Sequence, residues 1–202
     1  METKTETREY YTYNEVREWS MAGEWSVCPD DRNFRVSIAP DARIEPSVLL
    51  GSGATVRADA VVESGAEIES GAVIEAGAEI RAGAVIGSKA VVGPSATVGD
   101  RAAVEDWATV EAGAVIEAGA WVGTGAVIRA DALIDDDAVI GPEAMVGSGA
   151  EIESGATVRS GAMVGSNARV GTGAVIEDSA RVKAGARVWA GDVIEADAVA
   201  GA

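Results

Sequence analysis

From Val36 to the end of the chain, hydrophobic and polar positions follow a six-residue unit that repeats without insertion or deletion. The third residue of the unit is Val or Ile at 26 of 28 sites, and the first residue is Ala at 25 of 28 sites. A six-residue period fits neither the 3.6-residue period of a helix nor the alternation of a long strand. It fits a short strand that points one small and one β-branched side chain inward, followed by a turn. Gly, Asp, Ser and Asn concentrate at the unit ends, which predicts a solenoid with tight corners.

This pattern resembles the hexapeptide-repeat superfamily, whose members form a left-handed parallel β-helix with three units, or eighteen residues, per coil. The resemblance covers residues 36–202 and implies an all-β solenoid of about nine coils. The left hand is implied by the family alone, because the general rule favours right-handed crossovers. Residues eighteen positions apart, such as Ile68 and Ile86, should then be neighbours in one internal ladder.

Eighteen residues per coil sort the outward second residue of each unit onto three faces. The face that begins at Ala42 is mixed and charged, whereas the other two carry many outward apolar side chains, which usually mark a contact surface. We predict self-association, as a homotrimer by the family resemblance, with strand propensity on a solvated face as the alternative explanation. The predicted interface residues are Leu49, Val85, Trp121, Val139, Val175 and Val193 on one face and Val73, Val91, Val127, Met145 and Met163 on the next.

Residues 1–35 differ in kind from the repeat, and we interpret them as a capping or assembly segment. They hold all three tyrosines, the only phenylalanine and two of the five tryptophans, and residues 14–23 predict a short helix. Open solenoid ends invite edge-to-edge growth, so this segment either caps its own chain or covers another copy in a head-to-tail filament. The aromatic candidates are Tyr10, Tyr11, Tyr13, Trp19, Trp25 and Phe34.

The charge of the chain restricts its partners. Asp and Glu number 33 against 16 Lys and Arg, a formal net charge of -17. Such a surface repels phosphates and anionic lipids, so we expect neither nucleic acid nor a membrane as partner. Cys28 is the only cysteine, which excludes an intrachain disulfide. The start of the chain has no apolar signal region, and we expect a soluble protein, cytoplasmic or part of an assembled particle or filament.

The resemblance also implies chemistry, because the superfamily includes histidine-dependent acyltransferases and zinc carbonic anhydrases with three histidine ligands. This chain has no histidine, and no loop interrupts the repeat. Imidazole supplies both a base near neutral pH and a preferred zinc ligand. We therefore predict no enzyme, no catalytic residue, no metal and no cofactor, and a non-catalytic structural or scaffold solenoid. The alternative is a divergent acyltransferase or carbonic-anhydrase-like enzyme without the usual histidines.

One segment, residues 99–106, is similar to the gamma-class carbonic-anhydrase-like branch of the superfamily. It begins Gly-Asp-Arg, but Glu105 stands at the glutamine position and Glu111 at the position of a metal-binding histidine. We interpret the segment as shared ancestry or shared turn chemistry. The similarity therefore predicts no metal centre.

Two further surface features have explanations that involve no ligand. Asp135, Asp136 and Asp137 supply oxygen ligands that suit weak Ca²⁺ binding, but consecutive carboxylates on an extended chain point apart, which favours a solvated turn. Trp107, Trp121 and Trp189 suit stacking on sugars, but their units fall at unrelated places on the coil. We expect these rings to pack at an oligomer contact.

Overall fold

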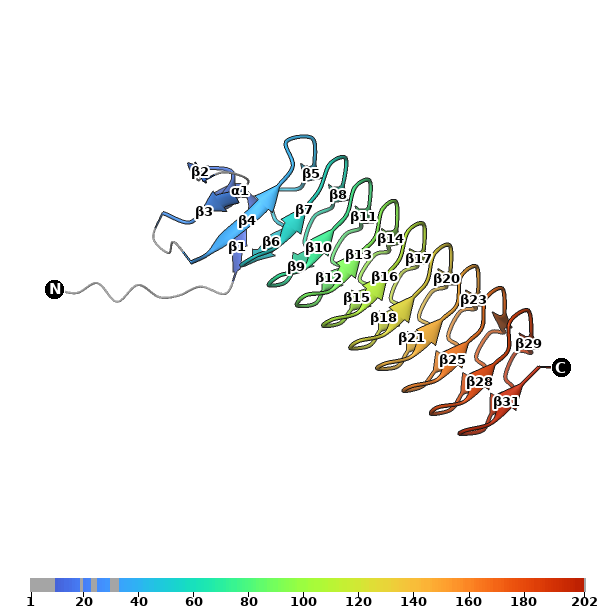
Figure 1. Ribbon diagram of the computed structural model, residues 1–202. Coiled ribbons are helices and arrows are strands. Elements are labelled where there is room, and N and C mark those ends of the chain that lie inside the picture. The colour runs from blue at the N-terminus through green and yellow to red at the C-terminus, as the bar shows by residue number, and fades with distance from the viewer. Residues whose placement is uncertain (1–9, 19, 23–24, 30–32, 202) are drawn as a thin grey trace.

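The computed structural model describes residues 10–18, 20–22, 25–29 and 33–201. It shows a parallel β-solenoid of about nine coils with three sheets along its length (Figure 1). Strands β7 to β31 are two residues long and start at six-residue intervals. No helix within the described residues has the length and apolarity needed to cross a bilayer.

The three sheets correspond to the three faces expected from the sequence. The ten-stranded sheet contains β1 (Tyr10–Thr12), β6 (Leu49–Gly51), β9 (Glu67–Ile68), β12 (Val85–Ile86), β15 (Ala103–Val104), β18 (Trp121–Val122), β21 (Val139–Ile140), β24 (Thr157–Val158), β27 (Val175–Ile176) and β30 (Val193–Ile194). The twelve-stranded sheet contains β2 (Ser20–Ala22), β3 (Trp25–Val27), β4 (Arg35–Ile38), β7 (Thr55–Val56), β10 (Val73–Ile74), β13 (Val91–Val92), β16 (Thr109–Val110), β19 (Val127–Ile128), β22 (Met145–Val146), β25 (Met163–Val164), β28 (Arg181–Val182) and β31 (Val199–Ala200). The nine-stranded sheet contains β5 (Arg43–Ile44), β8 (Val61–Val62), β11 (Glu79–Ile80), β14 (Thr97–Val98), β17 (Val115–Ile116), β20 (Leu133–Ile134), β23 (Glu151–Ile152), β26 (Arg169–Val170) and β29 (Arg187–Val188).

The register confirms the parallel β-helix with three units per coil. Val73 pairs with Val91 and Ile74 with Val92, a separation of eighteen residues in each case. The same separation holds along all three sheets from β4 onward. Residues eighteen positions apart are therefore neighbours on the same face.

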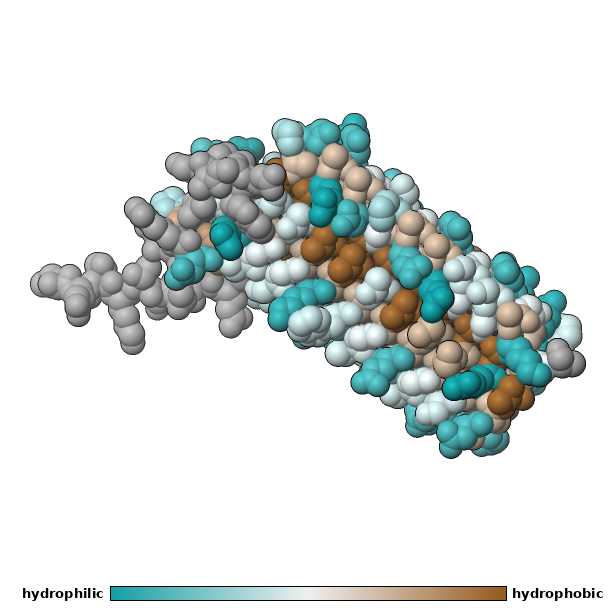
Figure 2. Space-filling view, in the orientation of Figure 1, coloured by the Kyte–Doolittle hydropathy of each residue, from teal (hydrophilic) through white to brown (hydrophobic). Residues whose placement is uncertain are grey.

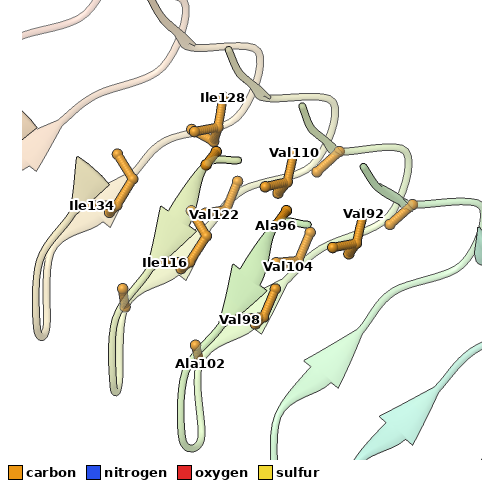
Figure 3. Packing of buried hydrophobic residues seen from close by; sticks show 14 of the residues in the cluster. Val92, Ala96, Val98, Ala102, Val104, Val110, Ile116, Val122, Ile128 and Ile134 are labelled. Atoms are coloured by element: carbon orange, nitrogen blue, oxygen red, sulfur yellow. The ribbon is translucent and has the colours of Figure 1, made fainter. Parts of the chain in front are cut away.

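The core consists of the first and third residues of each unit. From Ala54 to Val182 each of these side chains is at most 3% exposed. Figure 3 shows Val92, Val110 and Ile128 as one ladder that points into the interior. Burial of one such aliphatic side chain stabilises the fold by roughly 1.5 to 3 kcal/mol, so the stability is spread along the solenoid.

The corners have a fixed backbone conformation. From Gly53 to Asp197 the sixth residue of every unit has a positive φ, and eleven of these residues are not glycine. This left-handed conformation costs an L-residue roughly 1 to 2 kcal/mol. At these eleven corners the sequence therefore carries a residue that is less favourable than glycine in this backbone conformation.

The N-terminal segment packs on its own chain. Strand β1 pairs antiparallel with β6, and β2 and β3 form an antiparallel hairpin that joins β4. Helix α1 (Tyr13–Val16) is only four residues long, so the helix predicted over residues 14–23 is wrong beyond Val16. A capping box between Thr12 and Glu15 starts the helix, and the chain then leaves it to pair as β2.

Aromatic packing joins separate parts of this segment to one another. The Tyr11 and Phe34 rings meet edge to face with centroids 4.7 Å apart, and Phe34 is buried. The Cys28 thiol is also buried and donates to the Tyr11 hydroxyl at 3.4 Å. Tyr10 and Tyr13 are half-buried, Trp25 lies in β3, and Trp19 lies outside the described residues.

Candidate functional site

A groove of about 460 Å³ lies on the outer face of the twelve-stranded sheet, over β22 to β31. Its floor includes the outward side chains of Met145, Met163 and Val199. Figure 2 shows this face of the solenoid, where hydrophobic residues run in a stripe along the long axis with hydrophilic side chains beside it. The groove is therefore an apolar channel open to solvent.

The edge of the groove is a row of fourth-position residues, one from each coil. Arg129 and Lys183 stand at the ends of this row, and Gly147 and Gly165 lie between them. Paired strands are about 4.8 Å apart, so three coils separate the two cations by about 14 Å along the axis. The two glycines pack against the backbone of the next coil, and the stretch of the row between the two cations, here called the notch, has a positive group at each end.

The cations of the groove stand out in a chain with a net charge of -17. Arg129, Arg181 and Lys183 are all exposed. Arg129 Nη2 lies 3.3 Å from Met145 Sδ. Among the described residues none of these three cations takes part in an ion pair.

The composition of the groove suits a ligand with both an apolar chain and anionic groups. Methionine side chains adapt to the shape of an apolar ligand, and arginine and lysine bind phosphate and carboxylate oxygens. No carboxylate lines the groove, and Ser166 and Lys183 supply its hydroxyl and its amine. The groove can therefore bind and polarise an anionic acyl compound, but it offers no ordinary proton acceptor.

The carboxyl groups with shifted pKa values lie elsewhere, at the corner between the nine-stranded and ten-stranded sheets. Arg169 forms an ion pair with Glu153 at 2.6 Å, and Thr172 donates two hydrogen bonds to the same carboxylate. These contacts stabilise the charged form and lower the pKa of Glu153 to about 2. Burial and the neighbouring acidic groups raise the pKa of Asp135. Glu153 is thus a fixed anion that holds the corner, and neither group lines the groove.

The residues singled out for metal binding have structural roles. Glu111 accepts a hydrogen bond from the Ala130 amide at 3.1 Å, and Asp136 accepts one from the Ala118 amide at 3.0 Å. No group of three or more metal-binding side chains occurs within the described residues.

The predicted interface residues all lie on the outer faces of the ten-stranded and twelve-stranded sheets. They are half-buried, except that Val193 is 51% and Met163 is 37% exposed. Met145 and Met163 belong to the groove, which sequence reasoning did not identify. The sequence did contain a signal for the groove. Arg129 and Lys183 are fourth residues of their units on one face, and glycines occupy the same position on the two coils between them.

Comparison with known proteins finds a hexapeptide repeat in part of the chain. The family model described as hexapeptide repeat of succinyl-transferase matches residues 42–82. No curated protein matches the chain. The match contradicts the predictions of a non-catalytic scaffold and of no enzyme, and it supports the acyltransferase alternative. Absence of histidine removes one kind of base, but it does not remove the groove.

Several solved structures share the solenoid. The UDP-N-acetylglucosamine acyltransferase from Campylobacter jejuni aligns at 24% identity, covering 80% of this chain and 68% of that one, with a TM-score of 0.42. The corresponding enzyme from Francisella novicida aligns at 19% identity, with coverage of 77% and 65% and a TM-score of 0.38. The acetyltransferase domain of PglB from Neisseria gonorrhoeae aligns at 21% identity, with coverage of 81% and 50% and a TM-score of 0.25. At these values the likeness concerns the fold alone.

Proposed function

Because the chain belongs to the hexapeptide-repeat superfamily, we propose that it is an acyltransferase-type protein whose groove on the twelve-stranded sheet binds an acyl thioester. The observation that carries the proposal is the notch between Arg129 and Lys183 beside an apolar floor. The cations suit the phosphates of a carrier such as coenzyme A, and the methionines suit the acyl chain. The match to a succinyl-transferase repeat supports the same class of reaction.

The proposed transfer is a nucleophilic attack on the thioester carbonyl. The acceptor nucleophile bonds to the carbonyl carbon, the carbon–sulfur bond breaks, and the carrier leaves as a thiolate that takes up a proton. Lys183 and Arg181 are the cations available to stabilise the negative charge that develops on the carbonyl oxygen. Because no carboxylate lines the groove and the chain has no histidine, the acceptor must arrive already deprotonated.

Binding of the donor tests the groove directly. We expect acetyl-coenzyme A and succinyl-coenzyme A to bind in calorimetry, and the double variant Arg129→Ala/Lys183→Ala to bind at least about tenfold more weakly, since it loses two charge-assisted contacts. The double variant Arg43→Ala/Arg159→Ala removes the same charge away from the groove and should bind as the wild type does. Equal losses in both double variants would show a general charge effect and would overturn the assignment of the groove.

We also propose that copies of the chain associate through the outer face of the ten-stranded sheet. Val139 and Val175 are outward apolar residues on this sheet, and Trp121 lies beside Val139 with its indole held by Glu105 at 2.9 Å. Sedimentation velocity should give a mass above that of one chain, and Val139→Glu should lower it. Leu133→Glu, an equivalent change on the nine-stranded sheet, is the control and should leave the mass unchanged. A wild type that sediments as a monomer at micromolar concentration rules out this interface.

A further inference from the structure

Trp107 is an unusual corner residue. It occupies the sixth position of its unit with a φ of 61°, in the conformation that L-residues adopt at a cost. Its side chain is 59% exposed, so the ring adds little to the core. A bulky aromatic side chain in a strained conformation is an outlier from which a functional role can be inferred.

The residues stacked with Trp107 along this corner leave one side of it open. One coil before it, Lys89 places Nζ 4.1 Å from the centroid of the indole ring. One coil after it stands Gly125, and a Cβ built there would meet only Glu143 Cγ, at 3.9 Å. The corner therefore lacks a side chain at one level, about 5 Å along the axis, between Trp107 and Glu143, and we call this open level the slot.

The two acidic residues that precede Trp107 in the sequence are bonded elsewhere. Asp106 Oδ1 accepts a hydrogen bond from the Ser88 amide at 2.7 Å, one coil before Trp107 and next to Lys89, and Glu105 Oε1 accepts one from Trp121 Nε1 at 2.9 Å. The acidic side chain at the open level is Glu143, whose Cγ lies 3.9 Å from the Cβ position built on Gly125.

We propose that this slot binds a sugar ring. An indole surface packs against the apolar C–H face of a pyranose, and a carboxylate such as that of Glu143 accepts hydrogen bonds from its hydroxyls. Glu105, Asp106 and Glu143 repel phosphates and other anions, which selects a neutral ligand. The slot lies at the corner where the ten-stranded sheet leads into the twelve-stranded sheet, and the groove lies at the opposite edge of the latter. The inference is thus independent of the proposed acyl transfer.

Saturation-transfer difference NMR on the full chain tests this site with four neutral probes: glucose, galactose, mannose and N-acetylglucosamine. We expect transfer to the ring C–H protons of at least one sugar, and at least a fivefold smaller signal in Trp107→Ala. Trp189→Ala is the matched control, because Trp189 is 61% exposed and also stacks with a cation, Arg187, at 4.2 Å. This control should retain the signal.

A second variant fills the slot and keeps the ring. Gly125→Asn places a side chain at the open level, and asparagine tolerates a positive φ better than other residues of its size. We expect it to abolish sugar binding, while circular dichroism shows an unchanged fold. The proposal is overturned by no transfer to any of the four sugars, by equal signals in the wild type and Trp107→Ala, or by binding of tetramethylammonium in place of sugar.

Discussion

Replacement of Ile128 by alanine should lower the free energy of unfolding by about 2 to 5 kcal/mol. Ile128 has no exposed surface and pairs in register between Val110 and Val146 on the neighbouring coils. Both neighbours belong to rigid strands of the same sheet, so the structure can close the resulting cavity only in part. Urea unfolding followed by circular dichroism measures the loss.

Val127→Ala is the control, because Val127 precedes Ile128 on the same strand and points outward. It should cost less than about 1 kcal/mol, since the side chain is half-buried and leaves no closed cavity. Similar losses for Val127→Ala and Ile128→Ala would contradict the assignment of inward and outward positions.

Replacement of Gly147 by alanine should lower the free energy of unfolding by a similar amount, because it adds an atom to a filled space instead of leaving a cavity. A Cβ on Gly147 would lie 2.4 Å from the Ser166 amide nitrogen and 2.7 Å from the Gly165 carbonyl carbon. These are backbone atoms of the next coil, so two coils must move apart, and we expect a loss of about 3 kcal/mol, at the upper end for overpacking. Thermal and urea unfolding of the purified variant measure it.

Gly155→Ala separates this clash from the general cost of replacing a glycine. Gly155 has a φ of 65°, and a Cβ there meets nothing within 4 Å. Its replacement should cost about 1 kcal/mol through backbone strain alone. A loss for Gly147→Ala no larger than this would show that the coils separate easily at the groove.

The fold was accessible from the sequence because one period governs its energetics. Each Ala and each β-branched residue of a unit must be inward, and this requirement fixes strand, corner and register together. The N-terminal segment lacks such a period. The helix predicted there was therefore too long, because the chain after Val16 pairs as β2 with β3 and does not continue as a helix.

The candidate sites were harder to foresee because they depend on side chains from several coils. Arg129 and Lys183 are 54 residues apart in the sequence, and the two intervening glycines acquire meaning only when the coils are stacked. The slot at Gly125 likewise results from a missing side chain between Trp107 and Glu143. The composition shows that the chain has no histidine, which excludes histidine-based catalysis. It gives no information about which side chains meet on the surface.

Release of free thiol from acetyl-coenzyme A and succinyl-coenzyme A, in the presence of primary amines that span a range of pKa values, tests the proposed acyl transfer most directly. We expect thiol release that requires an amine, rises with pH in step with the pKa of that amine, and falls at least about tenfold in Arg129→Ala/Lys183→Ala. No release with any amine, or equal release by the wild type and this variant, would contradict it.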